Sequence, residues 1–511
     1  MPLLSTSDRT FAGTLTRITY SNPFRPERIA LEKEILGGDY VDTGPVWNWR
    51  SDLEGDRPNL EKLAARAVRL ADRVREALAG GGRADEEERI LYEDLVLYIL
   101  YHRNRLLFEP MLEAAPGRRG PERVEFYETF ERELTRYLNV PGVRSAARMD
   151  PSHLFACFFQ IRRAFHHLFR EIIGGSEAAA RLRATAWESI FTHDMRRYRR
   201  TLWARMGDVT TLITGPSGTG KELVARAIGL SRYVRFDPRS GTFAGDFAAS
   251  FHALNLAALP ATLVEAELFG HRRGAFTGAT ADREGWLETC PPHGTVFLDE
   301  IGDLAPEIQV KLLRVLQGRT FQRLGDVESK TFRGKIVAAT NRDLPREIAE
   351  GTFREDLYYR LCADLVTTPP LRDQIRGTPE ELHHLIVHIA RRVADDEAEA
   401  VAAEVEAWIA KHLGPDYPWP GNVRELEQCV RNVLVRGEYR PAPPAAAAGP
   451  REALRRGVEQ GTLTADELLR RYATKLYAET ESYEETAQKL AVDRRTAKSY
   501  IDPKLLESHR L

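Results

Sequence analysis

A glycine-rich turn between a short apolar strand and a helix constrains the fold of this chain most strongly. Residues 209–214 are mostly apolar or β-branched, and residues 222–228 are helical in character. A strand entering such a turn points several backbone N–H groups at one spot, beside the positive end of the helix dipole. Glycine is needed there because a Cβ would hold the backbone away from an anion. The pattern predicts a polyphosphate site at Gly215, Pro216, Ser217, Gly218, Thr219, Gly220 and Lys221, with Lys221 charging the β- and γ-phosphates.

This pattern departs from G-x-x-x-x-G-K-[ST] at its last position, where Glu222 replaces the hydroxyl that binds magnesium. Taken alone, the turn could bind nothing. A second element favours the nucleotide interpretation, because the apolar run 294–298 ends in Asp299 and Glu300. Ligands of parallel α/β sheets bind at the carboxyl ends of strands. We expect Asp299 to hold Mg²⁺ and Glu300 to polarise the attacking water; the alternative is a solvated acidic turn.

A third buried run, 335–340, ends in Asn341, a polar side chain suited to sensing the γ-phosphate. Three further strings stand out: 274–279 (Gly-Ala-Phe-Thr-Gly-Ala), 353–361 (Phe-Arg-Glu-Asp-Leu-Tyr-Tyr-Arg-Leu) and 419–426 (Trp-Pro-Gly-Asn-Val-Arg-Glu-Leu). With these strings the chain resembles the bacterial enhancer-binding AAA+ activators of σ54 RNA polymerase, over residues 201–436. In that family a glutamate after the lysine is usual, so Glu222 fits the resemblance.

The resemblance implies a role for each matching residue. Asn255 would hold the catalytic Glu300 until the nucleotide state releases it, and Arg424 would act as the sensor arginine of a helical lid. Arg354 and Arg360 would reach the nucleotide of the neighbouring subunit, which requires a hexameric or heptameric ring. For each arginine the alternative is an ordinary surface charge. The loop that contacts σ54 would be Gly274, Ala275, Phe276, Thr277, Gly278 and Ala279, with Phe276 and Thr277 at its tip.

Length and composition set the wider frame. A chain of 511 residues predicts about three domains, and a formal net charge of −2 provides no global field that would recruit nucleic acid. The four cysteines are scattered without paired spacing, which is typical of a reducing cytoplasm. No apolar run of about 18 residues and no signal-peptide pattern is present. We therefore expect a bacterial cytoplasmic protein without a membrane contact.

Residues 1–180 match no family that we recognise, but their periodicity is helical. Apolar residues recur at helical spacing between Leu60 and Leu78, again over residues 86–108, and again over residues 122–138. Asp150 and Pro151 predict the start of a further helix, as an N-cap followed by proline. The segment lacks the alternating strands of a phosphorylated receiver. Its position predicts an all-α regulatory domain.

The last of these helices carries four metal-ligating side chains among its phenylalanines: His153, Cys157, His166 and His167. A metal or haem pocket can be imagined from them. The favoured alternative is an aromatic core helix with partly buried histidines, because no second ligand pair is visible. The basic segment 196–205 that follows could touch DNA, but we favour a contact with an adjacent domain. Residues 233–251 suggest an enlarged loop before Asn255.

The C-terminal region predicts a DNA-binding module. Residues 441–450 are proline- and alanine-rich, as in a semi-rigid spacer. Residues 483–490 and 494–501 read as two short helices around a tight turn, with Asp493 capping the second. The segment resembles a Fis-like helix-turn-helix domain; the alternative is a three-helix dimerisation bundle without DNA contact. Candidate DNA contacts are Arg494, Arg495, Thr496 and Lys498.

Together these patterns predict a multidomain chain: an all-α regulatory domain (1–180), an α/β AAA+ ATPase core (185–375), a helical lid (376–437), a linker (438–460) and an all-α helix-turn-helix domain (461–511). The expected function is ATP- and Mg²⁺-dependent remodelling of the closed complex of σ54 RNA polymerase by a ring bound to double-stranded DNA upstream of promoters. The alternative function is an ATP-switched DNA-binding repressor or scaffold without productive turnover.

Overall fold

The structure is a computed structural model that describes residues 3–42, 44, 58–112, 123–141, 149–376, 378–441, 454–455, 457–458, 461, 463–502 and 505–506. The chain forms two compact units, residues 1–430 and residues 431–511, and the boundary lies inside helix α19 (Asn422–Arg436). The predicted linker 438–460 lies largely outside the described residues.

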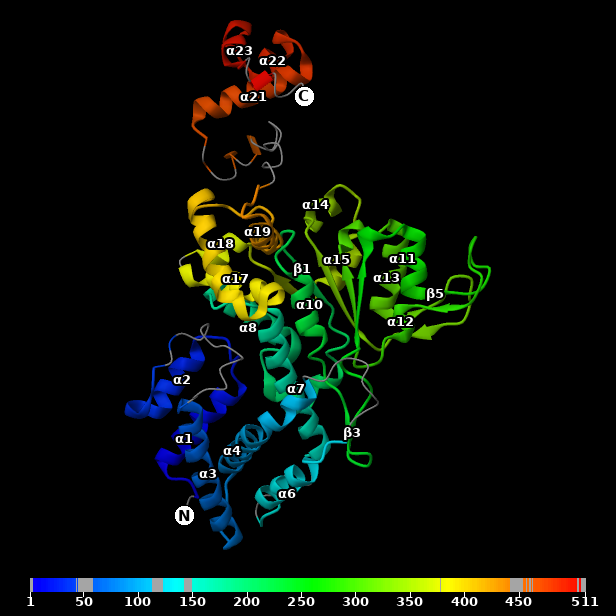
Figure 1. Ribbon diagram of the computed structural model, residues 1–511. Coiled ribbons are helices and arrows are strands. Elements are labelled where there is room, and N and C mark those ends of the chain that lie inside the picture. The colour runs from blue at the N-terminus through cyan, green and yellow to red at the C-terminus, as the bar shows by residue number, and fades with distance from the viewer. Residues whose placement is uncertain are drawn as a thin grey trace. The chain divides into compact units, whose positions relative to one another are not determined.

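A five-stranded parallel sheet forms the centre of the first unit (Figure 1). Its strands run in the order β11-β1-β10-β7-β4, and every pair is parallel. Because parallel neighbours need crossover connections, the sheet is covered by helices on both faces. The predicted α/β fold of the ATPase core is confirmed. The strands are β1 (Thr211–Thr214), β4 (Phe251–Asn255), β7 (Thr295–Asp299), β10 (Lys335–Thr340) and β11 (Asp364–Thr367).

Alternate residues of each strand enter separate hydrophobic cores, as the two-residue period of a strand requires. On β10, Ile336 and Ala338 face one core, whereas Val337 and Ala339 face the other. The first core is completed mainly by helices α11 (Ala261–Phe269), α13 (Pro306–Gly318) and α15 (Glu355–Leu361). The second is completed by α7 (Pro151–Glu171), α8 (Glu177–Phe191), α9 (Met195–Arg200) and α10 (Lys221–Gly229).

The segment before α7 is helical, as predicted. Helix α7 begins at the predicted cap, because the Asp150 side chain accepts a hydrogen bond from the Ser152 N–H and Pro151 occupies the first turn. Two helices near the N-terminus, α1 and α2, carried no pattern that we had singled out. The helices of this segment are α1 (Thr6–Tyr20), α2 (Glu27–Leu36), α3 (Pro58–Ala79), α4 (Glu86–Asn104), α5 (Glu109–Leu112) and α6 (Tyr127–Leu138).

The N-terminal helices and the ATPase core share their packing. The enlarged loop before Asn255 contains a short hairpin of β2 (Phe236–Asp237) and β3 (Thr242–Phe243). Its Phe236 ring lies 4.6 Å from the Tyr127 ring of α6 and 4.8 Å from the Phe155 ring of α7. Because α7 also completes the second core of the sheet, residues 1–180 do not pack as a module separate from the ATPase core.

Two small antiparallel hairpins and the lid complete the first unit. Hairpin β5–β6 (Gly270–His271 and Arg283–Glu284) brackets the segment 274–279, and hairpin β8–β9 pairs Thr320–Phe321 with Lys330–Thr331. The lid is helical, as predicted. The remaining helices are α12 (Trp286–Thr289), α14 (Leu344–Ala349), α16 (Leu371–Ile375), α17 (Pro379–Ala394), α18 (Ala398–His412) and α19.

The second unit contains three helices that contact one another: α21 (Ala465–Thr480), α22 (Tyr483–Leu490) and α23 (Arg494–Tyr500). The predicted bounds of α22 and α23 agree with the structure to within one residue. Asp493 caps α23 as predicted, since its carboxylate accepts hydrogen bonds from the N–H groups of Arg495 (2.9 Å) and Thr496 (3.0 Å).

Candidate functional site

The glycine-rich loop 215–220 lies between β1 and α10, in the strand–turn–helix arrangement that the sequence predicted. Lys221 is the first residue of α10, and its Nζ donates to the carbonyl oxygens of Gly215 (3.0 Å) and Pro216 (3.2 Å). The pKa of Lys221 is lowered by burial, while the carboxylates of Glu300 and Asp299 oppose that shift. The lysine therefore lies within the electrostatic reach of both acidic residues, as a nucleotide site requires.

The lid contacts this loop directly. In α19 the Arg424 guanidinium donates to Ser217 Oγ (3.2 Å), and the Asn422 amide donates to the Ser217 carbonyl oxygen (2.9 Å). Gly218 has a φ of +78°, and a Cβ there would overlap the carbonyl oxygen of Gly421. Glycine is thus required at this position both by the backbone and by the lid. The predicted lid arginine lies at the loop that it would sense.

The acidic pair stands at the carboxyl end of β7. Burial raises the pKa of Asp299, against the opposing effects of the Glu300 N–H and the Lys221 ammonium. Glu300 adopts a left-handed backbone with φ of +55°, and its carboxylate accepts a hydrogen bond from the Asn341 N–H (3.3 Å). A half-buried carboxylate beside a lysine and a glycine cradle fits a Mg²⁺–nucleotide complex. Asp299, Glu300 and Asn341 therefore converge on the edge where Lys221 lies.

Asn255 reaches the same edge, because β4 pairs with β7 and places Asn255 opposite Asp299. Its side-chain oxygen accepts hydrogen bonds from the N–H groups of Ala257 (3.0 Å) and Ala258 (3.2 Å). Asn255 thus caps the short turn after β4 in this structure, while Glu300 bonds to Asn341. The neighbouring positions suit the predicted switch, but the Asn255–Glu300 hydrogen bond is not formed.

The two predicted trans arginines lie on the exposed side of α15. Arg354 precedes the helix and makes a bidentate ion pair with Asp356, at 3.0 and 2.7 Å. Arg360 is exposed, and the neighbouring Tyr359 keeps 67% of its surface accessible. An exposed aromatic between two arginines is a composition typical of protein interfaces.

The segment 274–279 forms an exposed turn. The Gly274 N–H donates to the Ala279 carbonyl oxygen (2.8 Å), which closes the turn, and Thr277 at its tip is exposed. The Phe276 ring is half-buried and lies 5.0 Å from the His271 ring in an edge-to-face contact. Gly274 and Gly278 both have positive φ, and a Cβ on either would meet nothing within 4 Å. Backbone conformation, rather than space, therefore requires glycine at the two ends of the tip.

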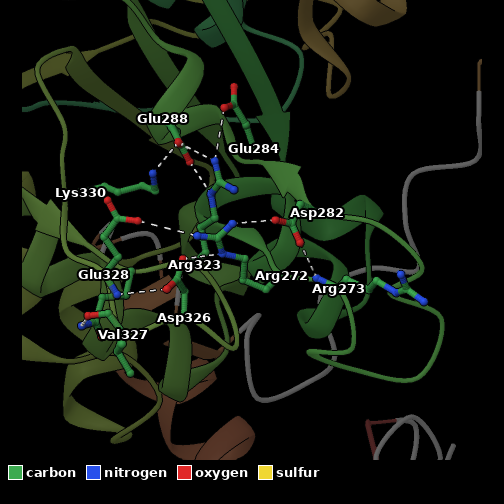
Figure 2. Close-up of polar contacts among 11 residues, drawn as sticks. Arg272, Arg273, Asp282, Glu284, Glu288, Arg323, Asp326, Val327, Glu328 and Lys330 are labelled. Carbon is green, nitrogen blue, oxygen red and sulfur yellow. Dashed lines mark hydrogen bonds and ion pairs between the residues drawn. The ribbon is translucent and has the colours of Figure 1, made fainter.

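A network of ion pairs joins the base of this turn to the β8–β9 hairpin (Figure 2). Arg272 contacts Asp282 across its own hairpin at 2.6 Å, and it contacts Asp326 of the second hairpin at 2.8 Å. The backbone adds two hydrogen bonds between the hairpins, one from the Arg272 N–H to the Leu324 carbonyl and one from the Leu324 N–H to the Gly270 carbonyl. These contacts fix the base of the turn against the β8–β9 hairpin.

A second set of ion pairs joins the β8–β9 hairpin to β6 and α12. Arg323 is only 8% exposed and contacts Glu288 at 2.6 Å and Glu284 at 3.3 Å, while Lys330 contacts Glu288 at 2.9 Å (Figure 2). The Arg323 and Lys330 charges hold the pKa of Glu288 below its usual range. Buried, multiply bonded charges of this kind fix geometry more than they add stability.

Of the α7 histidines, His153 is held by polar contacts on both ring nitrogens. The two ring nitrogens of His153 lie 2.9 Å from Tyr233 Oη and 2.8 Å from the Arg199 carbonyl oxygen. Burial raises the pKa of the Cys157 thiol to about 12 and lowers the pKa of His166 to about 4. Within the described ranges no group of three or more potential ligands is arranged around a metal position. None of the helices in that part of the chain is long and apolar enough to cross a bilayer.

The basic segment after α8 makes the predicted contact within the protein. Arg196 pairs with the buried carboxylate of Asp94 on α4, and its guanidinium lies 4.8 Å from the centre of the Tyr20 ring. This arginine therefore ties α9 to the N-terminal helices. The candidate DNA-contacting side chains Arg494, Arg495 and Thr496 occupy the exposed first turn of α23, and Lys498 is exposed one turn later, near the Tyr483 ring.

Sequence reasoning missed two groups of site residues. Thr368 lies beneath the phosphate loop, where its hydroxyl contacts the Thr219 hydroxyl at 2.6 Å and leaves no room for a Cβ on Gly215. Asn422 links the loop to the lid and also accepts a hydrogen bond from the Leu371 N–H (2.9 Å). Its place in the string 419–426 was a usable signal, whereas Thr368 follows β11 without any motif of its own. The ion pairs of Figure 2 join residues distant in sequence and carried no local signal.

The strand order and the convergence of the glycine loop, the acidic pair and the lid arginine define a P-loop ATPase core of the AAA+ class. Residues 192–366 match the family model of the Sigma-54 interaction domain. This region of the chain is therefore similar to the Sigma-54 interaction domain, and the predicted resemblance is confirmed for it.

Curated relatives align over the same central region. The chain is 44% identical over 229 residues to the Nif-specific regulatory protein of Azotobacter vinelandii, covering 45% of this chain and 40% of that protein. It is 44% identical over 230 residues to the DNA-binding transcriptional regulator NtrC of Rhizobium meliloti (strain 1021), covering 45% and 43%. The chain thus matches less than half the length of either relative. Among solved structures, NtrX from Brucella abortus aligns with 81% of this chain and 86% of its own at 23% identity, with a TM-score of 0.39.

Proposed function

We propose that the protein is an ATP-hydrolysing transcriptional activator that assembles as a hexameric or heptameric ring and remodels the σ54 RNA polymerase closed complex from an upstream DNA site. The observation that carries the proposal is that one domain combines the Lys221, Asp299 and Glu300 edge with a turn whose tip has a half-buried Phe276 and an exposed Thr277. As a bacterial transcription regulator, it would act in the cytoplasm.

The hydrolytic roles follow from the geometry of the edge. Lys221 and the loop amides hold the β- and γ-phosphates, and Glu300 orients and polarises the attacking water. Mg²⁺ held by Asp299 would supply charge neutralisation on the phosphate oxygens. Asn341 and Arg424 contact the phosphate side of the nucleotide, so that loss of the γ-phosphate alters the lid contact at Ser217.

Two parts of the chain, the arginines at α15 and the C-terminal helix α23, act outside their own subunit's nucleotide site. Arg354 and Arg360 stabilise the charge that develops on the γ-phosphate of the next subunit, which makes hydrolysis dependent on ring assembly. At the other end of the chain, α23 enters the major groove of DNA through Arg494, Arg495 and Thr496, with Lys498 on a phosphate. Several weak DNA contacts on one ring give a strong combined attachment.

The first test is Glu300→Gln in the full-length chain, with Glu307→Gln on the exposed side of α13 as the matched control. We expect Glu300→Gln to keep nucleotide binding. It should lower steady-state phosphate release at least about 100-fold, because general-base catalysis typically contributes about 10²- to 10⁴-fold to the rate. A parent protein that releases phosphate no faster than a hydrolysis-deficient Glu300→Gln would leave only the ATP-switched repressor or scaffold, whereas rapid release by both would show that Glu300 is not the catalytic residue.

The second test separates remodelling from generic hydrolysis. Thr277→Ala should leave ring-dependent hydrolysis within about twofold of the parent protein, since Thr277 is exposed and distant in sequence from the hydrolytic edge. Open-complex formation by σ54 polymerase on a supercoiled promoter should be lost. Thr280→Ala, an exposed threonine just beyond the turn, is the control and should retain both activities. Unchanged open-complex formation by Thr277→Ala would show that the turn is not the contact.

A further inference from the structure

A large cavity lies between the N-terminal helices and the lid, within the first unit of the chain. Its volume is about 1070 Å³, and it is walled by α1, α4, α7, α8 and the lid helix α17. Pockets that enclose small organic ligands usually span about 300–1000 Å³. The cavity therefore has room for such a molecule, and none of the hydrolytic residues described above lines it.

The apolar part of the wall is largely aromatic. Phe158, Phe165 and Phe169 project from α7, Trp187 from α8, and Val387 from the lid. Phe165 and Trp187 also contact each other, with ring centroids 4.9 Å apart. Flat aromatic rings of this kind can stack against an aromatic or apolar ligand and bury its surface.

The polar part of the wall presents hydrogen-bond donors without partners. Tyr98 is 4% exposed and Trp187 is 2% exposed, yet neither Tyr98 Oη nor Trp187 Nε1 has a hydrogen-bond partner in the part of the chain that the structure describes. His166 Nε2, on α7, also has no hydrogen-bond partner among the described residues. A buried polar group without a partner costs about 1–3 kcal/mol. The Tyr98 hydroxyl and the Trp187 indole N–H are donors, as is His166 Nε2 in one tautomer, and all three side chains line the cavity.

The charge of the wall is positive. Seven arginines but only three glutamates line the cavity. Two of those glutamates are already engaged, because Glu109 pairs with Arg162 and Glu399 contacts His383. Arg28 is paired with Glu32 and Arg162 with Glu109, so the other five arginines supply the positive charge that favours a ligand with at least one negative charge.

One of these arginines is buried. Arg183 is 2% exposed; its Nε donates to the Ile172 carbonyl oxygen at 3.0 Å and its Nη2 donates to the Gly174 carbonyl oxygen, while Nη1 has no hydrogen-bond partner among the described residues. Glu381 of α17 attracts the Arg183 charge, but the hydrogen bonds that its carboxylate accepts come from the Gly175 N–H and the Ser176 hydroxyl. A buried guanidinium nitrogen without an acceptor favours an acceptor-bearing anion beside it.

From these observations we infer that the cavity is a binding site for a small organic anion with an aromatic body, held between α7, α8 and the lid helix α17. The ligand's rings pack on Phe165 and Trp187, and its charge faces the arginines. Because the walls come from both the N-terminal helices and the lid, the bound molecule contacts the two segments at once.

The test uses a matched pair of fluorescent probes on the full-length protein: 8-anilinonaphthalene-1-sulfonate, an aromatic anion, and N-phenyl-1-naphthylamine, the same ring system without the sulfonate. We expect saturable binding of one sulfonate probe per chain, at least about tenfold tighter than binding of the neutral probe. Equal affinities for the two probes would overturn the anion assignment.

Two variants localise the binding. Ile161→Trp adds bulk to the cavity wall and should weaken binding of the anionic probe at least about tenfold, while thermal denaturation checks that the chain remains folded. Arg391→Gln removes an exposed charge that lines the cavity and should weaken binding about three- to fivefold. Its control is Arg392→Gln, the next residue of α17, which pairs with Glu427 and does not line the cavity. Parental affinity in both Ile161→Trp and Arg391→Gln, or equal loss in Arg391→Gln and Arg392→Gln, would overturn the site.

Discussion

The two ends of the chain relate to the ATPase core in different ways. At the N-terminal end, α7 contributes to two hydrophobic cores, one with the preceding helices and one with the central sheet. At the C-terminal end, α21 to α23 belong to a separate compact unit with internal contacts of its own. A segment that shares a core can transmit a change through packing, whereas a separate unit transmits one only through attachment.

This difference bears on the regulation that the sequence suggested. A detachable regulatory domain would have its own closed core and a linker. Here the β2–β3 hairpin of the ATPase core inserts Phe236 and Phe243 among the N-terminal helices. Any regulation by the N-terminal segment would therefore act through a continuous interior, since residues on both sides of the predicted boundary near residue 180 pack together.

Deleting each end of the chain in turn should show the largest difference in stability between the two ends. Deleting residues 1–180 removes α7 and opens both cores, exposing many side chains worth about 1.5–3 kcal/mol each against a total stability of about 5–15 kcal/mol. We expect an insoluble or unfolded product. Deleting residues 442–511 should leave the melting temperature of the first unit and its nucleotide binding unchanged, as measured by thermal denaturation. A soluble, nucleotide-binding chain lacking residues 1–180 would show that the N-terminal helices are separable after all.

A single aromatic truncation sharpens the same contrast. Phe236 is 1% exposed and lies against Tyr127 and Phe155, so Phe236→Ala should destabilise the first unit by about 3–5 kcal/mol. The matched variant in the second unit is Leu469→Ala, since Leu469 is 41% exposed on α21, and it should cost less than about 0.5 kcal/mol. Denaturant unfolding of the full-length chain measures both. Similar costs for the two variants would contradict the shared core.

The sequence predicted the ATPase core well because its signals are local. The turn at 215–221 and the acidic end of β7 each combine strand, turn and chemistry within a few residues, and both lie where expected. Helix caps are local too, which is why Asp150 and Asp493 were identified correctly. The parallel sheet then brings separate strand ends to one edge without further information.

The tertiary contacts could not be predicted for the opposite reason. The insertion of Phe236 among the N-terminal helices joins β2 to α6 and α7, about 80–110 residues earlier in the chain. Arg272 finds Asp326 across 54 residues, and only the adjacent hairpins explain that pairing. The cavity wall likewise combines helices from residues 6 to 394, none of which signals a pocket on its own. The trans roles of Arg354 and Arg360 and the DNA contacts of α23 stay predictions.

The contact of lid and loop gives a smaller test within the first unit. Gly218→Ala places a methyl group against Gly421 and should cost about 1–2 kcal/mol in backbone strain plus at least about tenfold in nucleotide affinity. Gly351→Ala is the control, because Gly351 has nearly the same φ (+76°) with nothing within 4 Å of the added methyl. It should show the strain alone, measured by unfolding and by titration with a fluorescent ATP analogue. Equal losses of affinity in both variants would mean that the lid contact is unimportant.

The smallest expected effect lies in the second unit. Asp493→Ala removes the cap of α23, whereas Asp493→Asn keeps an oxygen that accepts the Arg495 and Thr496 N–H groups. We expect the alanine variant to bind DNA more weakly than the asparagine variant by a few-fold, with ATP hydrolysis unchanged in both.

The pH range over which α23 keeps its cap in the parent protein follows from the pKa of the Asp493 carboxylate. The Thr496 hydroxyl and backbone N–H hold the pKa of Asp493 below its usual 3.8, so the carboxylate cap is present above that value and is lost only as the pH falls through the lowered pKa. The difference between the parent protein and the alanine variant should therefore stay constant from pH 6 to pH 8 in DNA-binding titrations. A change in hydrolysis with Asp493→Ala would contradict the separation of the two units, because a lost cap in a unit with its own core has no packed route to the hydrolytic edge.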